Sequence, residues 1–290
     1  GAAGGLNALF RAILQPGDEV ICPSPYFVEY AFYAGNYGAK LLPVASRDFT
    51  FELDVDGLIA AVTPRTRAVI LNSPHNPTGQ IYSRRELEEF GSRLLEAARK
   101  NGREICLIAD EPYRFLNFDS VEIPSLFSVY PDSVVIGSYS KNLSLAGERI
   151  GYVAVNPAME CANELLKALT LTTRILGFVN APNVAQQILK HCVNSQVDLE
   201  IYRERRAAMA KVLTDAGIEY TMPRGAFYFF PRSPLADEGK FIEKLVEERI
   251  LAVPGRGFGC PGYFRLAFCV GKEIIERSAE GFKRAVRACR

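Results

Sequence analysis

The sequence has few histidines and almost no net charge. Its 290 residues include two histidines, His75 and His191, and Lys plus Arg exceeds Asp plus Glu by 34 to 33. No His and Cys residues are spaced as metal ligands are, so we expect no metal site. The balanced charge offers no electrostatic attraction to nucleic acid or to an anionic membrane. We therefore expect neither of these as a partner.

Long hydrophobic runs and paired cysteines are also lacking. No apolar run approaches the roughly 20 residues that span a bilayer. The seven cysteines are an odd number and show no C-x-x-C spacing. Cys22, Cys106 and Cys269 lie in apolar strand-like runs, where cysteine behaves as a small hydrophobic residue. The sequence therefore predicts no disulfide framework and a reducing, cytoplasmic location.

Strand and helix patterns alternate through the first half of the chain. The strand-like runs are "EVICPSP", "AKLLPV", "RAVILNSP", "EICLIADEPY", "SVVIGSYSK" and "RIGYVAVN". Helical patterns separate the earlier runs, and Ser83 with Glu86 forms a capping box at the start of one of them. Apolar strands without polar alternation predict a mostly parallel sheet with helices on both faces, which is a three-layer α/β/α fold.

The pattern changes after about residue 157. Two long helical stretches follow, and then extended runs such as "IEYTMP" and "GAFYFFP" and a final helix from about Lys272. We expect a large domain over residues 1–200 and a smaller α+β domain over residues 201–290, with a charge-rich helix at residues 195–216 between them. Residue 1 opens a glycine-rich turn with no strand before it, so we expect the native protein to be longer.

Polar residues follow several of the predicted strands. Ligands of open parallel sheets bind beyond the carboxyl ends of the strands. Asp110 ends the run "EICLIAD", and Lys141 follows "VVIGSYS". Taken alone, a buried carboxylate is more often paired with a structural cation, and a lysine is more often on the surface. Asn76 and His75 likewise suit an ordinary turn in "SPHNPTG".

The combination of these residues matches the needs of pyridoxal phosphate. A lysine can form a Schiff base with its aldehyde, and a carboxylate can hold a proton on its pyridine nitrogen. The small residues at positions 1–5 precede a helix whose N-terminus suits an anion. Ser138, Ser140 and Arg149 are donors of the kind that hold a phosphate. An aromatic residue in "SPYF" could stack on the ring.

The sequence resembles the class I/II aminotransferases, pyridoxal-phosphate enzymes of the aspartate aminotransferase type with fold type I. The matching segments follow the family order and span nearly the whole chain: "PGDEV", "SPYF", "NSPHNPTG", "DEPY", "SYSKNLSLAGERIGY" and "FRLAF". The resemblance implies an enzyme that moves an amino group between an amino acid and a 2-oxo acid by a ping-pong mechanism. It also implies a homodimer.

The resemblance implies roles for single residues as well. Lys141 is expected to form the Schiff base and to shuttle the substrate proton, and Asp110 to pair with the pyridine nitrogen. Asn76 and Tyr113 are expected to donate to the phenolic oxygen of the ring, with Asn76 also near the substrate. The other expected roles are phosphate binding by the backbone of Ala2 and Ala3 and by the side chains of Ser138, Ser140 and Arg149, ring stacking by Phe27, and binding of the substrate α-carboxylate by Arg265.

Two alternatives remain open at the level of sequence. A β-eliminating carbon–sulfur lyase of the same fold would share all of these residues. A ligand-sensing domain of a transcription regulator would place an aminotransferase-like chain behind a DNA-binding segment. The first quarter of a typical family member has no counterpart here. That quarter supplies a tyrosine that reaches into the neighbouring subunit's site.

Overall fold

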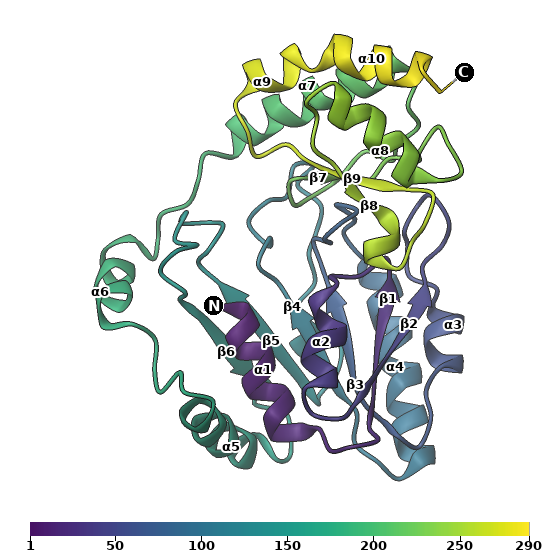
Figure 1. Cartoon of the computed structure of the whole chain (residues 1–290). Coiled ribbons are helices and arrows are strands. Elements are labelled where there is room, and N and C mark those ends of the chain that lie inside the picture. Colours follow the sequence, from purple (N-terminus) through teal and green to yellow (C-terminus); the bar gives the residue numbers. More distant parts are fainter. Residues whose placement is uncertain (290) are drawn as a thin grey trace.

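The computed structural model describes residues 1–289, which fold around two sheets (Figure 1). The larger sheet has the strand order β2-β1-β3-β4-β5-β6. Its strands are β1 (Glu19–Ser24), β2 (Lys40–Ala45), β3 (Thr66–Asn72), β4 (Cys106–Asp110), β5 (Ser133–Ser138) and β6 (Gly151–Val155). β1 to β5 pair in parallel and β6 runs antiparallel to β5. The predicted mostly parallel sheet is confirmed.

Helices cover both faces of this sheet. One face packs against α1 (Ala2–Ile13), α2 (Glu29–Gly35) and α5 (Ala162–Ile175). The other packs against α3 (Val55–Ala60), α4 (Arg84–Asn101) and the short helix η1 (Leu126–Ser128). Neighbouring strand residues divide between the two cores: Ile70 lies in the first, and Val69 and Leu71 lie in the second. This alternation follows from the pleat of a strand and confirms the three-layer fold.

Both ends of α4 are set by local sequence signals. The Ser83 hydroxyl accepts a hydrogen bond from the Glu86 backbone N–H, and the Glu86 carboxylate accepts one from the Ser83 N–H. Both bonds satisfy donors that the first turn of a helix leaves without a partner. At the other end Gly102 adopts a left-handed φ of 61°, which glycine tolerates without a steric penalty. The predicted capping box is confirmed.

The amino end of α1 lies very close to the sheet. The helix begins at Ala2, so residues 2–5 form its first turn; the prediction that they precede the helix as a turn is wrong. A Cβ on Gly5 would come within 2.9 Å of Val153 Cγ2 on β6. The small residues therefore allow the first turn of α1 to approach the strand directly.

The second sheet has the order β7-β9-β8 and is antiparallel. Its strands are β7 (Tyr228–Phe229), β8 (Val253–Pro254) and β9 (Phe264–Ala267), and η2 (Gly255–Phe258) follows β8. Its helices are α7 (Leu199–Ala216), α8 (Glu238–Glu247), α9 (Lys272–Arg277) and α10 (Ala279–Arg287). α7 packs against α9 and α10, and its Arg206 pairs with Asp119, after β4, at 2.9 Å.

Several expectations for the second half are wrong in detail. Residues 218–223 form no strand, and the final helix divides into α9 and α10 at Ser278. Cys269 is exposed and lies beyond the end of β9. α6 (Asn183–Cys192) was not predicted at all. Figure 1 shows α6 standing off from the body, at the far left.

Candidate active site

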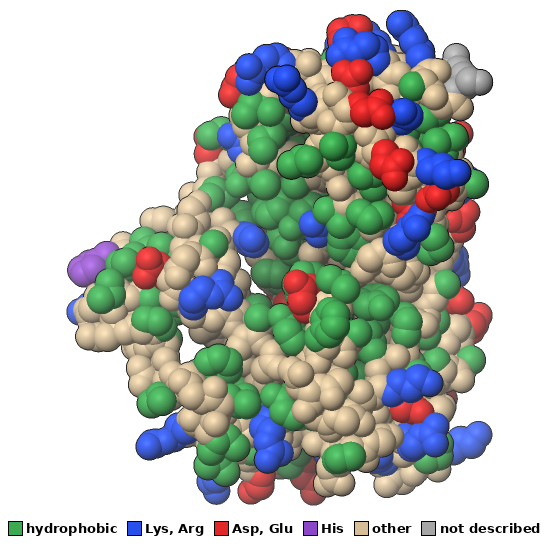
Figure 2. All heavy atoms as spheres, viewed as in Figure 1, with side chains coloured by type: hydrophobic (Ala, Val, Ile, Leu, Met, Phe, Trp, Pro, Cys, Tyr) green, Lys and Arg blue, Asp and Glu red, His purple; other side chains and the backbone are tan. Residues whose placement is uncertain are grey.

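The predicted site residues gather at the carboxyl edge of the large sheet. Asp110 ends β4 in register with Asn72 of β3 and with Ile136 of β5. Ser138, two residues after Ile136, is the last residue of β5 and pairs with Gly151, the first residue of β6. The chain between them carries Lys141 and Arg149, so the antiparallel return of β6 keeps both cations at this edge. Figure 2 shows the surface hollowed between the two units, with hydrophobic side chains on its upper wall and Lys or Arg at its border.

Asp110 is the most constrained of these residues. Its side chain is 5% exposed, and the Tyr30 hydroxyl donates a hydrogen bond to Oδ2 at 2.5 Å. Oδ1 is also buried and has no hydrogen-bond partner within residues 1–289. Burial raises the pKa of the Asp110 carboxyl to about 6, although the Tyr30 hydrogen bond opposes this shift. A buried acceptor without a donor is a place where a ligand N–H would be stabilising.

Lys141 lies in the turn after β5, beside the ring of Phe227, which directly precedes β7. Its Nζ is 5.6 Å from the centroid of the Phe227 ring. Phe227 in turn meets the ring of Tyr113 edge to face, with centroids 5.3 Å apart. Among the salt bridges of the described chain none involves Lys141. Within residues 1–289 the amine therefore lies beside an apolar ring rather than in an ion pair.

Arg265 joins the two sheets at the site. It lies on β9, and its Nη1 donates a hydrogen bond to Asn76 Oδ1 at 3.0 Å. Its guanidinium carbon is 4.6 Å from the Tyr228 ring centroid and 4.7 Å from that of Phe258. The two rings fix the plane of the guanidinium by cation–π contact. A guanidinium oriented in this way suits a planar anion such as a carboxylate.

Tyr228 is a site residue that the sequence reasoning missed. Its hydroxyl is 3.0 Å from the Tyr113 hydroxyl, and its ring packs on Arg265. Burial raises the pKa of both phenols. The aromatic run in "GAFYFFP" signalled a strand, but nothing in it indicated which ring would contact the arginine.

The amino end of α1 lies beside Arg149. The first hydrogen bond of the helix runs from the Gly5 N–H to the Gly1 carbonyl, so the N–H groups of Ala2 and Ala3 precede the helical ladder. The Arg149 guanidinium is at the same place, since a Cβ on Gly1 would lie 3.2 Å from its Nη2. Arg149 is exposed, and its Nη1 also donates to the Ala146 carbonyl at 2.8 Å. Helix N–H groups and a guanidinium together suit a phosphate.

The remaining predicted residues lie at the edge of this group. Ser138 ends β5 and Ser140 lies in the following turn, both half-buried. No hydrogen bond of the Ser140 side chain is present within the described chain. Phe27 is half-buried and meets Tyr30 edge to face, with ring centroids 5.5 Å apart. The structure thus links Phe27 to Asp110 through Tyr30, a residue that the sequence reasoning also missed.

His75 takes no part in this arrangement. It is 2% exposed, and its Nδ1 lies 2.7 Å from Thr78 Oγ1 within the turn. Burial lowers the pKa of His75 to about 3, which keeps the ring neutral. Within residues 1–289 no group of three or more His, Cys, Asp or Glu side chains is placed to bind a metal, and no helix is long and apolar enough to cross a membrane.

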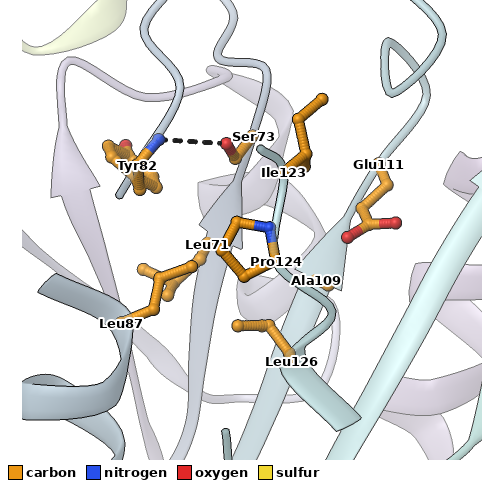
Figure 3. A pocket seen from close by; sticks show the side chains of 9 residues that line it. All are labelled: Leu71, Ser73, Tyr82, Leu87, Ala109, Glu111, Ile123, Pro124 and Leu126. Atoms are coloured by element: carbon orange, nitrogen blue, oxygen red, sulfur yellow. Dashed lines mark hydrogen bonds between the residues drawn. The ribbon is translucent and has the colours of Figure 1, made fainter. Parts of the chain in front are cut away.

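A separate small pocket lies on the α4 face of the sheet (Figure 3). It is lined by Leu71, Ser73, Tyr82, Leu87, Ala109, Glu111, Ile123, Pro124 and Leu126. The Tyr82 backbone N–H donates to Ser73 Oγ across it at 3.3 Å. Its volume is about 10 Å³, which is room for a single water molecule at most. It is not a ligand site.

Comparison with known proteins places these features in one family. The family model for aminotransferase class I and II matches residues 1–282. The chain belongs to this aminotransferase family. The probable aspartate/prephenate aminotransferase of Aquifex aeolicus is 32% identical over 98% of the chain and 73% of that protein. The aspartate aminotransferase of Bacillus subtilis is 32% identical over 99% of the chain and 74% of that protein.

Solved aminotransferase structures have the same fold. An amino transferase from Eubacterium rectale superposes with a TM-score of 0.96 at 38% identity, over 99% of this chain and 73% of that one. An aspartate aminotransferase from Thermotoga maritima gives a TM-score of 0.85 at 29% identity, over 99% and 74%. The chain is therefore an aminotransferase, and enzymes of this family use pyridoxal phosphate.

The residues present fit that cofactor. The unpaired Oδ1 of Asp110 matches a protonated pyridine nitrogen. The amino end of α1 with Arg149 matches the phosphate, and Lys141 supplies an amine without a salt-bridge partner in residues 1–289.

Proposed function

We propose that this aminotransferase exchanges the amino group of an amino acid with the oxo group of a 2-oxo acid in two half-reactions, by a ping-pong mechanism. The observation that carries the proposal is the Asp110 carboxylate, which is buried at the ligand edge of the sheet with one oxygen bonded and the other lacking a donor within residues 1–289. A carboxylate in this state is costly unless a cationic partner binds to it.

The cofactor would be held at four points. Asp110 would keep a proton on the ring nitrogen, and Phe27 would cover the ring. Asn76 and Tyr113 would donate toward the phenolic oxygen. The phosphate would be held by the backbone of Ala2 and Ala3 and the side chains of Ser138, Ser140 and Arg149. When bound, pyridoxal phosphate supplies an aldehyde that takes up the amino group and a ring that withdraws electrons from the substrate Cα.

The chain's own residues then bind the substrate and move its proton. Arg265, oriented by Asn76 and by two aromatic rings, pairs with the substrate α-carboxylate in a bidentate manner. Lys141, once its amine is free, takes the proton from the substrate Cα as a general base. The Phe227 ring lies beside this amine.

The test is the Lys141→Ala variant. Borohydride treatment of the wild-type holoenzyme should fix the cofactor covalently to Lys141, which peptide mapping by mass spectrometry would locate. Lys141→Ala should lose this attachment and transamination with a panel of amino donors, whereas Lys167→Ala, which changes an exposed lysine on α5, should keep both. Full activity in Lys141→Ala would exclude the assignment. Pyruvate and ammonia formed from cystathionine without an oxo-acid acceptor would instead identify a carbon–sulfur lyase.

The proposal extends to the homodimer expected from the family resemblance. Apolar side chains are exposed on α5, α6 and the segment between them; they are Leu166, Leu171, Ile175, Phe178, Val179, Val184 and Ile188. Exposed apolar side chains in this number on two successive helices are typical of a protein interface. Val184 alone is 67% exposed, and Figures 1 and 2 show α6 extending from the body. This surface would meet a second copy of the chain.

Two further proposals concern organisation and location. The large domain would comprise residues 1–200 and the small domain residues 201–290; this is supported by the separate core that α7 and the small sheet share with α9 and α10. The seven cysteines are free thiols, which supports a reducing compartment, and we propose the cytoplasm.

A further inference from the structure

We propose that Tyr30 is a positioning residue whose hydroxyl orients the Asp110 carboxylate and leaves Oδ1 directed at the bound cofactor. The inference rests on the proposed function, because it concerns the carboxylate that would pair with the pyridine nitrogen.

The two oxygens of Asp110 are not equivalent. Oδ2 accepts from the Tyr30 hydroxyl at 2.5 Å, whereas Oδ1 has no partner within residues 1–289. Asn72 lies next to Asp110 in the register, but its Nδ2 donates to the Asp110 backbone carbonyl at 2.6 Å and not to the carboxylate. In the described chain the Tyr30 hydroxyl is therefore the single hydrogen-bond donor to this side chain. Rotation of the carboxylate would break that bond.

Tyr30 is itself firmly held. It is 2% exposed, lies in the first turn of α2, and belongs to the core that α1 and α2 form with the sheet. Its ring meets Phe27 edge to face, and its backbone N–H donates to the Phe27 carbonyl at 3.0 Å. One turn of chain thus carries both the ring expected to cover the cofactor and the donor to Asp110. Because the hydroxyl is fixed in this way, its hydrogen bond to Oδ2 restricts the orientation of the Asp110 carboxylate.

Burial and the neighbouring carboxylate make Tyr30 a donor only. Burial, and then the nearby Asp110 carboxylate, raise the pKa of Tyr30 well above 10, so the phenol keeps its proton. The other titratable groups around Asp110 are Glu111, Tyr33 and Tyr113, none of them a cation. Hydrogen bonds to an ionised acceptor are the strong kind, so the Tyr30 bond favours the ionised carboxylate that the cofactor requires.

The experiment compares two buried tyrosines. Tyr30→Phe removes the hydroxyl and keeps the ring. Tyr130→Phe is the matched control, because Tyr130 is 1% exposed and its hydroxyl is buried without a partner in residues 1–289. Titrating cofactor-free protein with pyridoxal 5'-phosphate should give a Kd about tenfold higher for Tyr30→Phe and an unchanged Kd for Tyr130→Phe. The absorbance maximum of the bound cofactor should shift only in Tyr30→Phe.

A double-mutant cycle tests whether Tyr30 acts through Asp110. In an Asp110→Asn background, Tyr30→Phe should raise the Kd by less than it does in the wild type, because the carboxylate that accepts the Tyr30 hydrogen bond has been replaced. Incorporation of 3-fluorotyrosine at position 30 preserves packing and strengthens the donor. It should move the absorbance maximum in the direction opposite to Tyr30→Phe, and it remains informative if Tyr30→Phe does not fold.

The outcomes separate this inference from the proposed function. If the wild type binds the cofactor through Lys141 while Tyr30→Phe keeps the wild-type Kd and absorbance, Tyr30 is only a packing residue and the inference is wrong. If the wild type does not bind the cofactor, the proposed function itself fails.

Discussion

Arg265 and Asn76 share a hydrogen bond of 3.0 Å although 189 positions separate them in the chain. Asn76 belongs to the turn after β3 of the large sheet, and Arg265 belongs to β9 of the small one. The proposed substrate arginine is therefore oriented by a residue that also borders the proposed cofactor ring. Substrate binding and cofactor binding are joined at one pair of side chains.

Arg265→Lys should lower kcat/KM for amino acids by about 100-fold, mainly through KM. Lysine keeps the charge but loses the planar fork and its stacking on Tyr228 and Phe258. An amine without a carboxylate is the control substrate: its slow half-reaction, followed by absorbance, should change by no more than a few-fold. An equal loss of rate with both substrates would mean that Arg265 does not bind the substrate carboxylate.

Asp110→Asn should stabilise the cofactor-free protein at neutral pH. Burial raises the pKa of Asp110 from 3.8 to about 6, so the folded state holds this proton more tightly than the unfolded state does. The carboxyl therefore contributes its full share of stability below about pH 4 and loses it as pH rises through about 6. At pH 7.5 the variant should be more stable by up to about 3 kcal/mol, and the difference should vanish near pH 4.

Urea unfolding at several pH values would measure this difference. Asp56→Asn is the control, since Asp56 has an 87% exposed side chain and pairs with Arg93 at the surface; it should change stability by no more than about 1 kcal/mol. The same Asp110→Asn change should weaken cofactor binding. A variant less stable than the wild type at pH 7.5 would contradict the assignment of a costly buried charge.

Gly5→Ala should disturb both the fold and the phosphate site. The added methyl would lie 2.9 Å from Val153 Cγ2 and 3.3 Å from Ile136 Cγ2. Overpacking of this kind costs about 1–3 kcal/mol and would push the amino end of α1 away from β6. Thermal unfolding and cofactor titration should both report the loss.

Gly35→Ala provides the matched helical control. A Cβ on Gly35 meets nothing within 4 Å in the described chain, and the residue ends α2. This change should leave cofactor affinity unaltered and stabilise the helix by up to about 1 kcal/mol. If both glycine variants bound the cofactor equally well, the position of α1 would not matter to the phosphate.

Val184→Asp should dissociate the proposed homodimer. A charge on the exposed α6 surface would have to be desolvated in the interface, which is strongly unfavourable. Sedimentation velocity over a concentration series should show a dimer for the wild type and a monomer for the variant. Leu251→Asp is the control because Leu251 is 83% exposed on the small unit; it should remain dimeric. A wild-type protein that is monomeric at micromolar concentration would contradict the proposed homodimer.

The large sheet could be predicted from the sequence because its signals are local. Unbroken apolar runs such as the one ending at Asp110 are typical of buried parallel strands, and Ser83 with Glu86 marks a helix start without any tertiary information. The same logic placed Asp110, Lys141 and Arg149 at strand ends or in the turns after them, where the topology brings them to one edge.

The parts that could not be predicted depend on contacts between distant segments. Tyr30 lies three residues after Phe27, but only the packing of α2 on the sheet brings its hydroxyl to Asp110. Tyr228 acts through two residues, Tyr113 and Arg265, that lie more than thirty positions away from it. α6 is a different case. Val184, Ala185, Ile188 and Leu189 recur at helical spacing, so the signal for this helix was in the sequence and was missed.

The order of the site residues along the chain has a consequence for synthesis. The residues proposed to hold the cofactor lie between Ala2 and Arg149, and the large sheet is complete at Val155. Arg265, proposed to select the substrate, comes more than a hundred residues later, on β9. Because domains fold as they leave the ribosome, amino end first, a growing chain would gain its cofactor pocket well before it could recognise an amino acid.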